Sequence, residues 1–288
     1  MENLETMGSG MGDALQQTGT RRDALRGASL WGAGLMLMTA PALFGALAKK
    51  AYANHTATVL DVLQFALTLE YLEAEFYTLG VAQAGLIPAA DRQIFTTIRD
   101  HEQAHVDFLR QAITDAGAMP VAKPTFDFTA GGNFNPFGNY EDFKALAQAF
   151  EDTGVRAYKG GAPVLINNKP VLTAALTIHS VEARHASEVR RLRGNFAEQA
   201  PQKGWITGKD RGTGMPAATQ AVYEAGTNPT VYPAEDNVTQ GGANVSTLPG
   251  ATATAATEAF DEPLDIDAVL MIADLFIVGD ADGDGTET

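Results

Sequence analysis

The stretch Leu67–Tyr77, with the sequence LTLEYLEAEFY, places the glutamate Glu70 seven residues before the tyrosine Tyr77. Seven residues span two turns of an α-helix, so both side chains lie on one helix face. Further along the chain, Glu102 and His105 form a Glu-x-x-His motif. A glutamate and a histidine three residues apart also share a helix face, so both can point into the interior of a helical bundle.

The same pattern occurs a second time. Glu151 precedes Tyr158 by seven residues, and Glu182 and His185 form the second Glu-x-x-His motif at nearly the same separation as in the first copy. No other Glu-x-x-His occurs in the sequence. Four carboxylates and two imidazoles in this arrangement have the spacing with which four helices hold two metal ions.

Apolar periodicity predicts an all-α domain over residues 54–195. Its helices are expected at about Thr56–Leu79, from Pro88 to a stop near Gly117, at Tyr140–Lys159 with an end at Gly160-Gly161, and from Pro170 to Gly194. The links within each helix pair are short, whereas Ala118–Asn139 between the pairs is long. Two antiparallel hairpins joined by one long crossover are the ferritin-like form of a four-helix bundle.

Residues 196–288 are expected to form a largely irregular C-terminal extension, because Gly, Pro, Thr and Asn dominate Trp205–Thr257. The apolar stretch Ala268–Val278 predicts a short last helix that returns to pack on the bundle, before an acidic tail.

Residues 1–53 have the features of a twin-arginine-like export signal. Arg21-Arg22 precedes an uncharged run, Ala28–Ala48, and Ala51-Tyr52-Ala53 offers the small-x-small pattern of a cleavage site. We therefore expect an exported protein, periplasmic or extracellular after cleavage near Ala53. An uncleaved membrane anchor is the alternative, since the uncharged run is long enough to span a bilayer.

Composition restricts the partners. A net charge of −15 argues against nucleic acid, which is bound by clustered Lys and Arg. Cysteine is absent, so any metal is held by oxygen and nitrogen, which favours iron, manganese or zinc. No second segment is apolar enough to cross a membrane. We therefore expect the mature form not to be associated with a membrane. The oligomeric state stays open.

The quoted stretch and the duplicated motif resemble the ferritin-like di-metal carboxylate superfamily, in particular exported bacterial ferritin-like proteins related to plant desiccation-associated proteins. The resemblance covers about Thr56 to Gly194 and implies two iron ions, or manganese. It implies that Glu102 and Glu182 bridge the metals, that Glu70 and Glu151 are terminal ligands, that His105 and His185 are nitrogen ligands, and that Tyr77 and Tyr158 hydrogen-bond ligand carboxylates.

Four nearby residues carry weaker expectations. His179, one turn before Glu182, is expected to support the ligands from outside the coordination sphere, with a surplus ligand as the alternative. Glu73 is expected to be solvated or to support a ligand, with a role as a ligand itself as the alternative. His101 is expected to be a surface or packing residue, and Gly154 to mark close helix packing or a local bulge.

Three functions are compatible with this site. The leading hypothesis is a redox-active protein that oxidises its bound metal with oxygen or peroxide in protection against oxidative or desiccation stress. The alternatives are a manganese-catalase-like enzyme that dismutates peroxide, and a non-enzymatic stress or envelope protein that retains the fold. A fold does not by itself select a reaction, so the sequence leaves these open.

Overall fold

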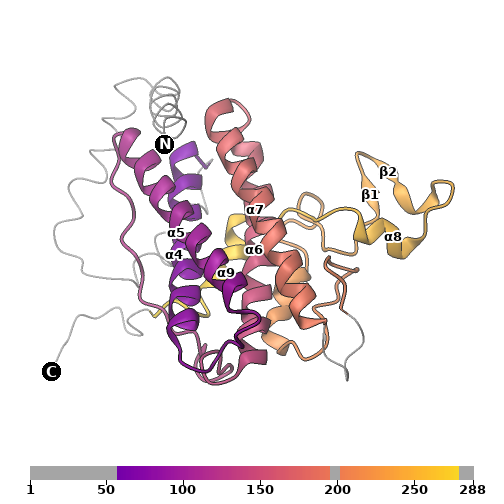
Figure 1. Ribbon diagram of the computed structural model, residues 1–288. Helices are drawn as coiled ribbons and strands as arrows, with labels where there is room; N and C mark the ends of the chain where they lie inside the picture. Colours follow the sequence, from indigo (N-terminus) through magenta and orange to yellow (C-terminus); the bar gives the residue numbers. More distant parts are fainter. Residues whose placement is uncertain (1–56, 195–201, 279–288) are drawn as a thin grey trace.

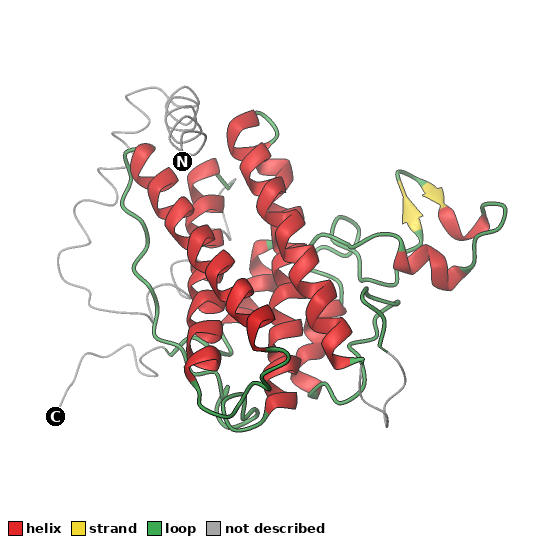
Figure 2. Cartoon of the chain, viewed as in Figure 1, coloured by secondary structure: helices red, strands yellow, loops and turns green. Residues whose placement is uncertain are grey.

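The computed structural model describes residues 57–194 and 202–278. Four long helices lie side by side as a bundle (Figures 1 and 2). They are α4 (Val59–Ala82), α5 (Arg92–Asp115), α6 (Tyr140–Leu165) and α7 (Lys169–Arg193). The predicted all-α ferritin-like bundle is confirmed. The predicted export signal and acidic tail lie outside the described residues.

Local sequence fixes where these helices begin. Thr58 and Asp61 form a capping box at the start of α4, in which each side chain accepts a backbone N–H of the other residue. The Asn139 side chain accepts the N–H of Glu141 at the start of α6. Pro170 lies in the first turn of α7, where its missing N–H leaves no helical hydrogen bond unmade.

The helices pair as the link lengths predict. Helix α4 packs on α5, and α6 packs on α7. Residues 116–139 form the long crossover, which inserts Phe128 and Phe134 into an aromatic cluster at one end of the bundle. In this cluster the stacked rings of Phe76 and Phe143 have centroids 4.8 Å apart, which joins α4 to α6.

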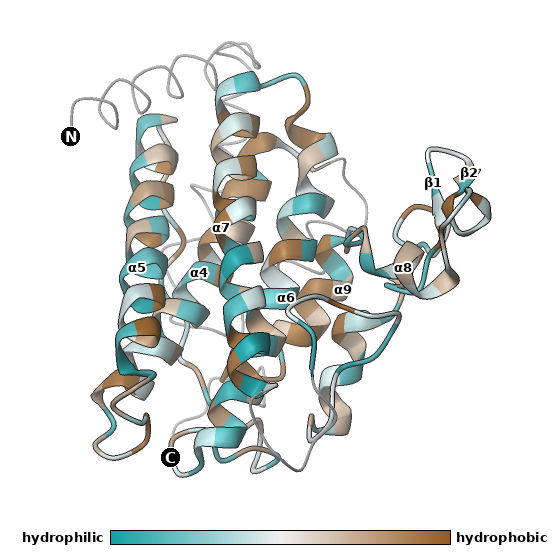
Figure 3. Cartoon of the chain, turned by 45° about the vertical axis from the view of Figure 1, so that its right-hand side comes forward, coloured by the Kyte–Doolittle hydropathy of each residue, from teal (hydrophilic) through white to brown (hydrophobic). Residues whose placement is uncertain are grey.

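Helices α4 and α5 differ in how much of their surface is buried. Buried residues of α5 recur every three or four positions, and hydrophilic and hydrophobic residues are mixed along it (Figure 3). Helix α4 is buried on nearly every side, because the C-terminal extension covers the face that the other bundle helices leave open. Phe65 and Leu69 on that face pack in one cluster with Leu264 and Val269 of the extension.

The C-terminal extension consists of short elements. They are η1 (Ala217–Tyr223), β1 (Thr239–Gln240), β2 (Ala243–Asn244), η2 (Val245–Thr247), α8 (Ala253–Glu258) and α9 (Ile266–Ala273). The β1–β2 hairpin and α8 project away from the bundle, whereas α9 packs on α6 (Figure 1). The predicted irregular segment ending in a short helix on the bundle is confirmed.

One buried arginine of α6 holds the irregular part of the extension in place. The guanidinium of Arg156 lies 2.8 Å from Glu235 and donates to the backbone carbonyls of Pro233 and Glu262, each at 3.0 Å. A charged donor that is fully buried needs such partners, and loop carbonyls need donors. Arg156 therefore satisfies polar groups of the extension that no helix or sheet would satisfy.

The expected end of the third helix at Gly160-Gly161 is wrong, since α6 continues to Leu165. Gly160 is a packing residue: a Cβ built there would lie 1.9 Å from the carbonyl oxygen of Leu264. A Cβ at Gly161 would meet only a methyl group of Val62, at 3.1 Å. The first glycine therefore allows the extension to approach α6 closely.

Replacing Gly160 with alanine should disrupt the packing of the extension against α6. We expect Gly160→Ala to lower the free energy of unfolding by about 1–3 kcal/mol, because the new methyl group meets backbone that cannot rotate away. The matched variant Gly161→Ala should change stability by less than about 1 kcal/mol, since the helical preference of alanine offsets mild crowding. Urea unfolding of both variants is the measurement, and equal losses would contradict this assignment.

Candidate metal centre

The four long helices bring all six predicted ligands to one place inside the bundle. The candidate ligand atoms form two groups of four residues, and within each group they lie within 4.8 Å of one another. One group is Glu70, Glu102, His105 and Glu182, and the other is Glu102, Glu151, Glu182 and His185. Glu102 and Glu182 belong to both groups, which is the arrangement that bridging carboxylates require.

Both histidines face the carboxylates with Nδ1. His105 Nδ1 lies 3.2 Å from Glu70, 3.0 Å from Glu102 and 3.3 Å from Glu182. His185 Nδ1 lies 2.8 Å from Glu102 and 3.2 Å from Glu151. One imidazole nitrogen is therefore available on each side of the shared carboxylates.

Each tyrosine serves the other copy of the motif. Tyr77 donates its hydroxyl to Glu151, and Tyr158 donates its hydroxyl to Glu70. These hydrogen bonds use Oε1 of each glutamate, while Oε2 faces a histidine. The tyrosines thus fix the rotation of the two carboxylates and leave one oxygen of each directed into the cluster.

Unpaired buried atoms show that these residues fit metal ions. The four cluster glutamates are fully buried. Among the residues that the structure describes, Glu182 Oε2 has no hydrogen-bond partner, while Glu102 Oε1, Glu151 Oε2 and Glu182 Oε1 each face only an imidazole Nδ1, at 2.8, 3.2 and 3.3 Å. Burying charged oxygens without partners is costly, whereas a cation would accept their lone pairs. Four carboxylates balance two divalent ions, and oxygen with one imidazole per ion suits iron or manganese.

The carboxyl groups differ in how they titrate without metal. Burial raises the pKa of Glu70 to about 7, and it raises the pKa values of Glu151 and Glu182 as well. Burial also opposes ionisation of Glu102, but hydrogen bonds from His105 and His185 outweigh it and lower the pKa of Glu102 to about 2. Glu102 is therefore the carboxylate that stays ionised.

The histidines titrate in the opposite sense. Burial lowers the pKa of His185, but the carboxylates of Glu151 and Glu102 outweigh this effect and raise it to about 11. The same balance, with Glu70 as the leading carboxylate, raises the pKa of His105. The metal-free cluster therefore holds protons on both imidazoles and on some carboxyl groups, and metal binding must displace them.

A fifth carboxylate lies beside the cluster. Glu73 is buried, so the expectation that it is solvated is wrong, although it belongs to neither group of four. Burial and the nearby glutamates, Glu182 foremost, raise its pKa. A Cβ at Gly154 would lie 2.9 Å from Glu182 Oε2 and 3.4 Å from Glu73 Oε1. Gly154 therefore leaves room for two carboxylates, and α6 passes through it without interruption.

The two remaining histidines of the bundle differ from each other. His179 lies in neither group, and its buried Nδ1 has no hydrogen-bond partner in the described part of the chain. His101 is exposed, as expected of a surface residue, but it also makes an unexpected contact, because its Nδ1 lies 2.9 Å from His185 Nε2. The sequence signal for this contact was the spacing of four residues to His105, which places both histidines on one face of α5.

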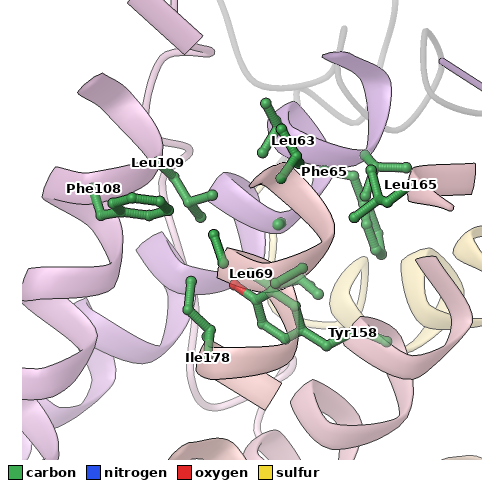
Figure 4. Close-up of a pocket in the computed structure, with 14 residues that line it drawn as sticks. Leu63, Phe65, Leu69, Phe108, Leu109, Tyr158, Leu165 and Ile178 are labelled. Atoms are coloured by element: carbon green, nitrogen blue, oxygen red, sulfur yellow. The ribbon is translucent and has the colours of Figure 1, made fainter. Parts of the chain in front are cut away.

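An apolar cavity lies between the helices of the bundle (Figure 4). All four long helices line it, and Ala66, Leu109 and Ile178 each lie one helical turn from a cluster residue. Tyr158, whose hydroxyl donates a hydrogen bond to Glu70, also lines the cavity. The cavity volume is about 20 Å³, enough for one molecule of the size of water.

Comparison with known proteins supports the same fold. Residues 58–195 match a family model described as a ferritin-like domain. The matched segment is similar to that family. The match covers the bundle and not the extension, and it supports the ferritin-like superfamily without deciding the subgroup. No curated protein matches the chain.

Metal binding should release protons. We expect manganese(II) affinity to rise as the pH is raised through about 7, because the ions displace protons from Glu70 and the histidines. Stability of the metal-free protein should fall between pH 4.5 and about 7, since folded Glu70 keeps a proton that the unfolded chain has lost. Calorimetric titration in two buffers of different ionisation enthalpy measures the released protons. An affinity independent of pH would contradict the ligand set.

A methyl group at residue 154 should impair the site without unfolding the helix. We expect Gly154→Ala to weaken metal binding by about tenfold or more, because the new Cβ displaces the Glu182 carboxylate. Alanine favours the helix by about 1 kcal/mol, so metal-free stability should hold. Metal titration and thermal unfolding are compared with Gly161→Ala, which should keep full affinity. Similar affinities for the two variants would show that Gly154 makes no room for Glu182.

Proposed function

We propose that this protein is an exported ferritin-like protein that holds two iron or manganese ions and oxidises the bound metal with oxygen or peroxide, in protection against oxidative or desiccation stress. The observation that carries the proposal is the pair of buried ligand groups that share Glu102 and Glu182 and contain one histidine each. Two adjacent ions can each supply one of the two electrons that convert a peroxide molecule, with two protons, into two waters.

The surrounding residues suit such a reaction. Tyr77 and Tyr158 hold the two terminal carboxylates in fixed orientations. Burial of all four glutamates keeps bulk water from the centre. The apolar cavity next to Tyr158 has room for a molecule as small as oxygen and selects against larger or charged compounds.

The proposed export rests on the N-terminal sequence, and the proposed stress role rests on the resemblance to desiccation-associated proteins. The twin arginines and the cleavage pattern before residue 54 support transport out of the cytoplasm. Within residues 57–194 and 202–278, no helix has both the length and the apolar character to cross a membrane.

Anaerobic iron(II) titration followed by exposure to oxygen or peroxide tests the proposal. The wild type should bind two iron(II) ions and then consume the oxidant as iron(III) absorbance appears. Glu102→Gln together with Glu182→Gln should abolish both, because each substitution removes a shared carboxylate. Glu188→Gln is the matched control, since Glu188 pairs with Arg191 outside both ligand groups.

The outcomes separate the competing functions. Binding of two iron(II) ions without consumption of oxygen or peroxide would overturn the redox proposal and favour a structural metal site. Oxygen evolution from peroxide by the manganese-loaded protein, absent from the iron-loaded protein, would identify catalase-like chemistry. Cleavage of the expressed full chain near Ala53 during export is the separate test of localisation.

A further inference from the structure

His101 belongs to neither group of candidate ligands, but it contacts a residue that does. It lies on α5, one helical turn before His105, and its side chain is exposed. Its Nδ1 lies 2.9 Å from Nε2 of His185, which is fixed on α7. The contact therefore joins two helices across the site, from a surface residue to a buried candidate ligand.

The geometry is that of a nitrogen–nitrogen hydrogen bond. The ring planes differ by 17° and the ring centroids are 5.2 Å apart, while the two nitrogens are only 2.9 Å apart. The rings thus meet edge to edge and nearly in one plane. This alignment lets an N–H on one ring point along the lone pair of the other.

A hydrogen bond between these two nitrogens contains one proton. Which ring carries that proton depends on which nitrogen of His185 faces the metal site. A neutral imidazole has one donor and one acceptor nitrogen. His185 Nδ1 faces Glu102 and Glu151, so its lone pair is the one available to a metal ion. The proton of His185 then resides on Nε2 and is donated to His101 Nδ1, whose own proton is on the exposed side of its ring.

The other half of the site lacks this contact. His105 is the counterpart of His185 in the duplicated motif, and the residue four positions before His185 is Val181. Valine has no hydrogen-bonding side-chain atom, so it cannot repeat the role of His101. The two metal positions therefore have similar ligands but different support.

We propose that His101 is a positioning residue that fixes His185 as an Nδ1 ligand and so strengthens metal binding at the position formed by Glu102, Glu151, Glu182 and His185. This inference rests on the metal binding in the proposed function. It does not depend on whether the bound metal reacts with oxygen or peroxide.

Stepwise metal titration of His101 variants tests the inference. His101→Phe removes the acceptor and should weaken one of two binding steps by about 10–100-fold, as loss of an outer hydrogen-bond partner does elsewhere. His101→Gln retains an acceptor oxygen and should lose less. The weakened step should be the one that His185→Gln removes and not the one that His105→Gln removes. Val181→Ala, the matched change in the other half, should alter neither step.

Nuclear magnetic resonance of the zinc-loaded protein gives a second readout. The wild type should show an Nε2–H proton of His185 that exchanges slowly with solvent, and His101→Phe should make this exchange fast. Two bound ions with both steps unchanged in His101→Phe, or weakened equally, would overturn the inference alone. A wild type that binds no pair of ions would overturn both the inference and the proposed function.

Discussion

The burial of four carboxylates between four helices is the constraint on which the rest of this structure depends. Each buried ionised carboxylate costs several kcal/mol unless opposite charge or hydrogen bonds compensate it. In the metal-free protein, protons on the carboxyl groups and charged imidazoles provide that compensation, as the raised pKa values of Glu70 and His185 indicate. Two divalent ions would provide it without protons, which couples metal binding to both pH and folding.

The crossover and the extension keep this centre enclosed. The aromatic cluster around Phe76 closes the bundle beside Tyr77, and α9 covers α4 and α6 on the side that a bare four-helix bundle would expose. Ile272 and Ala273 of α9 line a small cavity together with Glu73 and Gly154, directly behind the carboxylates. The extension is thus part of the low-dielectric surroundings that set the pKa values of the site.

Helical periodicity made the bundle predictable, because the spacing of Glu70 and Tyr77 is a local property of the chain. The role of residues as ligands remains a prediction, although the structure brings all six together. Contacts between distant segments were not predictable. In the sequence, Gly160 resembles a helix stop and Arg156 resembles a surface charge. Only the structure shows that Leu264 packs against Gly160 and that the extension surrounds Arg156. Which glutamate each tyrosine serves also depends on how the helices face one another.

The two copies of the duplicated motif differ at the residue that lies three positions after the first glutamate. Three residues after Glu70 the first copy has Glu73, whereas three residues after Glu151 the second has Gly154. These two positions meet: the space that a side chain at Gly154 would fill is the space that the carboxylates of Glu73 and Glu182 occupy. A second glutamate at that point would bury a sixth carboxylate with no added cation to balance it. The extra acid in one copy therefore requires the glycine in the other, so the two halves are complementary and not equivalent.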